Sequence, residues 1–236
     1  MSESNSNTPQ QIALAIELSN PSASSQAHAA ALFSWSDPEG ELIGSMPIPE
    51  GMRSSDAIMV LVEGLCAEHG FKPTDVDRVI VSIGPGGYTA LRIATTTAKV
   101  LAHSIGCSLV AVPTPKVAAG AIDLAHRPAL IALASKNNLA HCSVVHSDGD
   151  IQAVGVIDAA MIESLEICSI FADSFLPATF IQAAEHLGIE IYPIVLDARN
   201  CFDAASRIPP IAPIELAPIY AREPDAITQW RERKRK

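Results

Sequence analysis

The chain has 236 residues, of which 48% are hydrophobic and 18% are charged, as is usual for a globular protein large enough to bury a substantial core. Its formal net charge of -10 argues against a protein that grips a nucleic-acid backbone unaided, because such binding requires a broad positive surface. Any link to RNA is therefore expected to run through a partner protein.

The first half of the chain predicts a three-stranded meander followed by alternating helices and strands. Residues 1–9 are polar and predict a flexible tail. Apolar runs separated by Asn, Pro, Asp and Gly turn signals predict strands over 12–16, 28–35 and 41–48. The elements that follow are a helix over 54–69, a strand over 78–83, a glycine loop over 84–87, a helix over 90–105 and a strand over 109–112.

The second half repeats this order after a helix predicted over 114–124. Its elements are strands over 129–134, 140–146 and 151–156, a helical stretch over 158–165, a strand over 167–171, a helix over 178–187 and a strand over 189–194. The order β-β-β-α-β-α thus occurs twice. Parallel αβ barrels and dinucleotide-binding folds do not open each half with a meander.

The repeat predicts an α/β protein with the two-lobed actin/hexokinase/Hsp70-like fold, which carries one such unit in each lobe. We expect an N-terminal lobe over 10–113, a C-terminal lobe over 114–229 and a basic tail over 230–236. The duplication lies in the order of elements, since the two halves share no residue-level similarity.

The lack of a recognisable targeting signal and the spacing of the cysteines favour a cytoplasmic protein. The first residues, MSESNSNTPQQ, lack the basic and apolar regions of a secretory signal, and no apolar run approaches the roughly 20 residues that cross a bilayer. The five cysteines contain no C-x-x-C pair, which favours reduced thiols over disulfides or a zinc site. They are Cys66, Cys107, Cys142, Cys168 and Cys201.

The glycine loop between a predicted strand and helix is the most distinctive local feature. Gly84, Gly86 and Gly87 permit backbone angles that a β-carbon excludes, and Pro85 stiffens the loop. Thr89 is predicted to cap the helix that follows. A phosphate site at the helix N-terminus and a tight turn with close backbone packing both remain open, although neither the Walker nor the dinucleotide fingerprint is present.

This loop resembles the G-P-G-S-F-T-G-L-R-I-G block of TsaB, the bacterial tRNA threonylcarbamoyladenosine biosynthesis family. The chain reads G-P-G-G-Y-T-A-L-R-I-A over 84–94, with Gly87, Tyr88, Ala90 and Ala94 departing from the family pattern. The retained residues are Gly84, Pro85, Gly86, Thr89, Leu91, Arg92 and Ile93. Residues 15–19 and 218–222 resemble the family's opening A-I-D-T-S and closing P-x-Y-L-R, whereas 130–202 match poorly.

The resemblance implies a non-catalytic, glycoprotease-like subunit that forms a heterodimer with its catalytic paralogue TsaD. Together with the ATPase TsaE, that pair transfers threonylcarbamoyl to the adenosine beside the tRNA anticodon. The chain would then be a scaffold that meets tRNA indirectly, through the complex. A divergent small-molecule kinase or a peptidase of the same fold remains the alternative.

The sequence offers little chemistry of its own, so we expect no catalytic residue, cofactor or metal. An actin-like nucleotide site needs an acidic residue beside a glycine-rich hairpin, but the matching segment, 17–21, is Ser/Pro-rich. The matching strand of the second lobe ends in Ala134-Ser-Lys136 without a carboxylate, and no glycine follows Gly188. His141 and His146 are spaced five apart on a predicted strand, which places them on opposite faces.

The helix over 90–105 carries two apolar stripes, although a surface helix needs only one. The narrower stripe is Ile93, Thr97, Val100 and Ser104, and Val60 lies on the far side of the preceding helix. Packing within the lobe would account for a second stripe. With the resemblance, we expect these residues to contact TsaD or a second copy of the chain.

Two further contacts are expected from charge. Arg92 lies in the first turn of its helix, where a cation is disfavoured, so a carboxylate partner is expected, with Glu17 as the candidate. The basic C-terminus is either solvated or touches tRNA phosphates in the assembled complex. Its residues are Arg231, Arg233, Lys234, Arg235 and Lys236.

Overall fold

The computed structural model describes residues 11–20, 27–36, 39–49, 51–52, 54–221 and 230. The predicted tail over 1–9 lies outside these residues, as do the candidate tRNA contacts Arg231, Arg233, Lys234, Arg235 and Lys236. Within the described part of the chain, no helix combines the length and apolarity that a membrane span requires.

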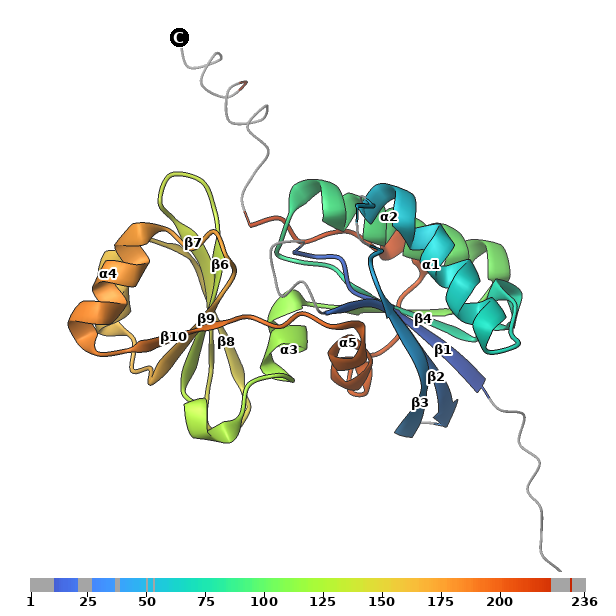
Figure 1. Ribbon diagram of the computed structural model, residues 1–236, viewed down its shortest axis with the longest axis horizontal. Coiled ribbons are helices and arrows are strands. Elements are labelled where there is room, and N and C mark those ends of the chain that lie inside the picture. The colour runs from blue at the N-terminus through green and yellow to red at the C-terminus, as the bar shows by residue number, and fades with distance from the viewer. Residues whose placement is uncertain are drawn as a thin grey trace, which may run out of the picture.

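The N-terminal lobe is built on a five-stranded sheet in the order β3-β2-β1-β4-β5 (Figure 1). Its strands are β1 (Gln11–Ile16), β2 (His28–Ser36), β3 (Glu39–Pro47), β4 (Arg78–Ser82) and β5 (Ser108–Val112). The first three strands form the predicted antiparallel meander, and β4 and β5 run parallel to β1. The parallel strands need crossover connections, which two helices provide.

Helices α1 (Ser54–Glu68) and α2 (Tyr88–Ile105) cover one face of this sheet (Figure 1). Ile12, Leu14 and Ile16 alternate along β1 and pack against both helices. The broad apolar stripe of α2 faces them through Leu91, Ala94, Thr95, Ala98, Leu101 and Ala102. The small side chains in this stripe let α2 lie close to the sheet.

The C-terminal lobe repeats the arrangement in the order β10-β9-β6-β7-β8. Its strands are β6 (Ala129–Ala134), β7 (Ala140–Val145), β8 (Ile151–Ile157), β9 (Ser169–Ala172) and β10 (Glu190–Pro193). Helix α4 (Ala178–Leu187) and the 3-10 helix η3 (Ala159–Ser164) cover its outer face, where Phe180 and Ile162 are fully buried. The predicted duplication of the β-β-β-α-β-α unit and the actin-like fold are confirmed.

Two short helices lie between the sheets, α3 (Thr114–Ala119) and α5 (Ala198–Ala205) (Figure 1). Helix α3 ends at Ala119, earlier than the predicted residue 124, with Gly120 as its C-cap. The 3-10 turns are η1 (Pro73–Asp75), η2 (Leu124–His126) and η4 (Pro213–Glu215). The apolar residues of α3 and α5 share one core with the facing sides of both sheets.

Helix α5 was not expected from the sequence, and it follows the second sheet in the chain but packs on the first. It contacts β1, β2, β4 and β5, and its Phe202 stacks on Phe33 of β2 with ring centroids 3.8 Å apart. Further along, Ile211 and Ile219 donate backbone hydrogen bonds to Leu109 and Ile83 of the first lobe. The division of the chain into lobes over 10–113 and 114–229 stays a prediction.

Candidate functional site

The glycine loop forms a tight crossing of three backbone segments at the end of β4. Gly84 has φ +104°, and a β-carbon there would collide with the carbonyl oxygen of Ile219. A β-carbon on Gly86 would collide with the carbonyl oxygen of Ser19. Both positions therefore require glycine for close backbone approach, which favours the tight-turn interpretation.

Backbone hydrogen bonds occupy two polar groups of the loop. The amide of Gly87 donates to the carbonyl of Ser19 at 2.7 Å, and the carbonyl of Gly84 accepts from the amide of Thr114 at 2.8 Å. A phosphate at a helix N-terminus is held by free amide groups. The amide of Gly87 is already committed to the chain itself, so the loop is poorly suited to that role.

The predicted cap at Thr89 is wrong. Helix α2 begins at Tyr88, with Gly87 as its N-cap in extended conformation, and no side chain caps it. Because the helix starts before Thr89, this residue is the second of the helix, and its exposed side chain does not occupy the N-cap position.

The predicted ion pair between Arg92 and Glu17 is also wrong. The guanidinium of Arg92 lies 5.5 Å from the ring centroid of Tyr88, and its Nη1 donates to the Tyr88 hydroxyl at 3.4 Å. Glu17 is only 4% exposed, and its Oε1 accepts from the amide of Ser19 at 2.6 Å. The carboxylate turns inward at the end of β1, whereas Arg92 points outward from α2.

Glu17 belongs to a buried polar cluster between the lobes. We call the four residues Glu17, Ser19, Ser82 and Thr114 the interlobe polar cluster. The hydroxyls of Ser82 and Thr114 lie 3.0 Å apart, while Glu17 Oε2 and Ser19 Oγ have no hydrogen-bond partner among the described residues. Burial raises the pKa of Glu17, and its contacts with Ser19 and Ser82 offset this only in part.

The raised pKa of Glu17 predicts that stability falls as pH rises. Between the ordinary value of 4.5 and the higher folded value, the native state binds more protons than the unfolded chain, so the free energy of unfolding decreases with pH. Each pKa unit of difference amounts to about 1.4 kcal/mol. We expect Glu17→Gln to remove this decline. The free energy of unfolding of the variant, relative to that of the wild type, should therefore be higher at pH 8 than at pH 5, as measured by urea denaturation.

The exposed Glu68 at the end of α1 supplies the matched control for this measurement. Glu68→Gln should leave the pH dependence of the wild type in place. A Glu17→Gln variant whose stability changes with pH as the wild type's does would show that the buried carboxyl does not carry the effect.

Asp173 is a buried carboxylate that is not among the residues predicted from the sequence. It follows β9 and is 7% exposed. Its Oδ2 accepts from the amide of Ala134 and from Asn20 Nδ2, both at 2.9 Å, and its Oδ1 accepts from the amide of Phe175 at 2.9 Å. Asp173 therefore ties the loop after β1 to the second lobe. An acidic residue directly after a buried strand was the available signal.

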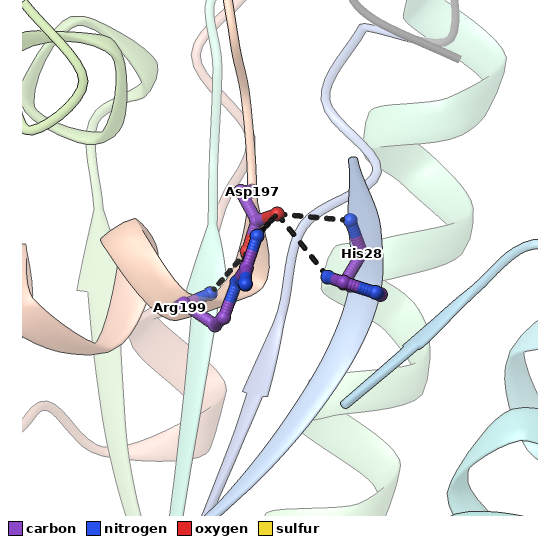
Figure 2. A network of polar contacts seen from close by, with 3 residues as sticks. All are labelled: His28, Asp197 and Arg199. Carbon is purple, nitrogen blue, oxygen red and sulfur yellow. Dashed lines mark hydrogen bonds and ion pairs between the residues drawn. The ribbon is translucent and has the colours of Figure 1, made fainter. Parts of the chain in front are cut away.

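Asp197 forms a second tie, shown in Figure 2. At 2% exposed, it caps α5 and accepts from the amide, Nε and Nη2 of Arg199, each at 2.8 Å. Its Oδ2 also accepts from the amide of His28 at 3.0 Å and lies 3.5 Å from His28 Nδ1. Burial raises the pKa of Asp197, but the hydrogen bonds from Arg199 and His28 outweigh it and leave the pKa below its ordinary value.

The outer surface of α1 and α2 contains the residues predicted to contact a partner. Val60 and Val100 are 52% and 56% exposed, and Ser104 is exposed. Ile93 and Thr97 are half-buried, and Ile93 packs partly against the core of the lobe.

Among the described residues, no group of three or more His, Cys, Asp or Glu side chains is placed to hold a metal ion.

The family model of the tRNA N6-adenosine threonylcarbamoyltransferases, TsaD, matches residues 44–171, which is more than half of the chain. The chain belongs to this family. The matched part runs from β3 through the glycine loop to β9, so it includes both α1 and α2. The TsaD-family chain thus belongs with the proteins of tRNA threonylcarbamoyl modification, and the expectation from the glycine loop is confirmed at that level. No curated protein matches it at a significant level.

Two solved structures share the fold of this TsaD-family chain. One is a Pseudomonas aeruginosa protein described as similar to peptidase YeaZ, with 16% identity, a TM-score of 0.63 and coverage of 90% of this chain and 100% of that one. The other is YeaZ from Pseudomonas aeruginosa, with 15% identity, a TM-score of 0.63 and coverage of 89% and 99%. At this identity the likeness establishes the two-lobed fold.

Proposed function

We propose that the protein is the non-catalytic dimerisation subunit of a tRNA threonylcarbamoyl-modifying complex, and that it binds the catalytic TsaD paralogue through α1 and α2. The observation that carries the proposal is the apolar and small-residue character of their outer surface. We call this surface the α1–α2 face. It comprises Met59, Val60, Gly64, Ile93, Thr97, Val100 and Ser104.

The exposure of this face is costly unless a partner covers it. Met59, Val60 and Val100 are large apolar side chains, exposed by 39%, 52% and 56%. A β-carbon on Gly64 would meet no atom within 4 Å, so the surface there is open. Two adjacent helices that present small residues accept the ridges of two further helices at close distance. A second actin-like chain carries such a helix pair.

The state of the nucleotide-site elements supports a non-catalytic role. Glu17, which stands where an actin-like enzyme needs an acidic group, is buried and bonded to the backbone of Ser19. The Gly87 amide is bonded to the Ser19 carbonyl. Asp173 uses both carboxylate oxygens to join chain segments. These groups hold the chain together and leave little to orient a metal or phosphates.

The test introduces two charges on the α1–α2 face. Val60→Glu combined with Val100→Glu should weaken binding to TsaD by at least about 100-fold, because two carboxylates would lose water against an apolar partner surface. Isothermal titration calorimetry with purified TsaD measures the affinity. Size-exclusion chromatography of the chain alone shows whether a homodimer uses the same face.

A matched pair in the second lobe controls for the added charge. Val156 and Ile181 are 39% and 41% exposed, so Val156→Glu combined with Ile181→Glu should bind TsaD as the wild type does. Equal affinity of the α1–α2 variant and the wild type would refute the proposed interface. Magnesium-dependent ATP hydrolysis by the purified chain alone would refute the non-catalytic role.

The remaining parts of the assembly follow from the same proposal. The ATPase TsaE is proposed to join the complex of the two actin-like chains. The basic residues Arg231, Arg233, Lys234, Arg235 and Lys236 are proposed to touch tRNA phosphates once the complex has formed, as is consistent with their charge. A cytoplasmic location suits a protein that acts on tRNA.

A further inference from the structure

Each of the two sheets has two edge strands, and three of these four edges are protected against further pairing. Strand β3 contains the exposed Glu41 and ends at Pro47, and β10 has only four residues and ends at Pro193. Strand β5 is covered by an antiparallel bridge from Ile211 to Leu109. Charged residues, proline, short length and a covering segment are among the devices that keep proteins from pairing edge to edge.

Strand β8 has none of these four features. Its seven residues, Ile151–Ile157, contain neither a charged side chain nor proline, and no other described segment pairs with it on the side away from β7. Alternate residues of an antiparallel strand direct their N–H and C=O groups away from the neighbouring strand, so β8 presents backbone groups that are open to a further strand. A bulge at Val154 adds twist but leaves the residues on both sides extended against β7. Val156, at 39% exposed, adds an apolar side chain for a cross-strand contact.

Exposed carboxylates lie at both ends of β8. Asp148 and Asp150 precede the strand, and Asp158 follows it directly. Arg127 lies beside the turn that precedes β8, but its Nη2 donates to two backbone carbonyls of the segment before it. The ends of β8 are therefore acidic, whereas the strand between them is uncharged.

This distribution of charge selects the kind of strand that fits. If a second copy of the chain paired antiparallel and centred on Val154, Asp150 of each chain would lie opposite Asp158 of the other, and like charges placed opposite each other are destabilising. A strand with Lys or Arg at both ends would place opposite charges there instead. The charge pattern thus favours a basic-ended strand of another protein over self-pairing.

We propose that β8 binds an extended segment of another protein by strand addition, and that this segment is uncharged opposite β8 and carries Lys or Arg at each end. Main-chain hydrogen bonds provide the affinity, and the terminal charges fix the register. Strand β8 lies in the other lobe from α1 and α2 (Figure 1). A chain held by a partner at the α1–α2 face therefore keeps β8 free for a third protein, which goes beyond the proposed function.

The test uses a fluorescein-labelled peptide in which Val and Thr alternate between paired lysines at both ends. Fluorescence anisotropy measures its binding to the full-length chain. The wild type should bind this peptide at least about tenfold more tightly than the same peptide with glutamates in place of the lysines. Because the terminal charges are exposed, added salt should weaken binding of the lysine-ended peptide.

Two variants test the edge itself. Ala153→Lys should weaken binding of the lysine-ended peptide by about tenfold or more, because a lysine on an edge strand hinders pairing and repels the peptide. Asp150→Asn, which removes one terminal charge and leaves the strand unchanged, should weaken it by about threefold. Ala67→Lys, the same substitution at an exposed position of α1, should bind the peptide as the wild type does. Since all three positions are exposed, thermal melting of each variant should match that of the wild type.

Hydrogen exchange locates the bound peptide. Amides of β8 that are not bonded to β7 should exchange more slowly with the lysine-ended peptide present, whereas those of β3 should not change. No binding, equal affinity for both peptides, equal affinity of Ala153→Lys and wild type, or protection at another site would overturn the proposal. So would a dimer of the variant with Val60→Glu and Val100→Glu that Ala153→Lys dissociates, since β8 would then pair with a second copy. That double variant should bind the peptide as the wild type does, so failure of the proposed TsaD interface would be seen separately.

Discussion

Gly84→Ala is expected to lower the free energy of unfolding by about 3 kcal/mol or more, for two reasons that add. The backbone at Gly84 has φ +104°, which strains any residue with a β-carbon. The added methyl would also collide with the carbonyl oxygen of Ile219 and with the Leu91 side chain. The Ile219 segment cannot withdraw easily, because its amide is bonded to Ile83. Urea denaturation at neutral pH measures the loss.

Gly106 separates the two causes. It has φ +78° at the end of α2, but a β-carbon there would meet no atom within 4 Å. Gly106→Ala should therefore show only the backbone strain, about 1 kcal/mol. If Gly84→Ala cost no more than Gly106→Ala, the crossing of Gly84 and Ile219 would not be rigid.

Asp197→Ala is expected to cost about 2–4 kcal/mol, because one carboxylate serves several donors. Its removal uncaps α5, leaves the amide of His28 without its acceptor, and frees the guanidinium of Arg199 (Figure 2). The loss should also depend on pH. The folded pKa lies below the ordinary value of 3.8, so the contribution is full at neutral pH and disappears as pH falls through the folded value.

Two control variants are available for Asp197→Ala. One is a milder substitution at the same position, and the other removes an exposed helix cap elsewhere. Asp197→Asn keeps an acceptor oxygen and should cost less than the alanine variant. Asp158 caps η3 in an exposed position, so Asp158→Ala should cost about 1 kcal/mol or less. Guanidinium denaturation between pH 7 and pH 3 distinguishes them. An Asp197→Ala variant that unfolds at the wild-type midpoint would show that α5 does not depend on this carboxylate.

The tertiary ties connect residues that are far apart in the chain, which is why sequence reasoning could not find them. The Asp173–Asn20 bond joins residues 153 positions apart, and the Asp197–His28 bond joins residues 169 apart. The predicted Arg92–Glu17 pair also joins residues far apart in the chain, and it is wrong because the Glu17 side chain turns into the core. Charge and sequence spacing do not reveal whether a side chain at a strand end points inward.

Helix α5 shows the limit of short periodic signals. Its buried residues, Ala198, Cys201, Phe202 and Ala205, follow helical spacing, and Asp197 precedes them as a cap. The helix has only eight residues, too few to stand out against loops of similar composition. It packs on the first sheet, far along the chain from its sequence neighbours, and its Phe202 stacks on Phe33 of β2.

The amino-acid sequence was sufficient for the strands, the longer helices, the duplicated order and the glycine loop of the family, because each depends on contacts within a few residues. Turn signals and periodicity act at that range, and they agree over nearly the whole chain. The interlobe polar cluster, the ties through Asp173 and Asp197, and the ring contact between Tyr88 and Tyr220 arose only on folding. Each depends on which strand ends meet and which side chains face inward, and packing over long distances along the chain settles both.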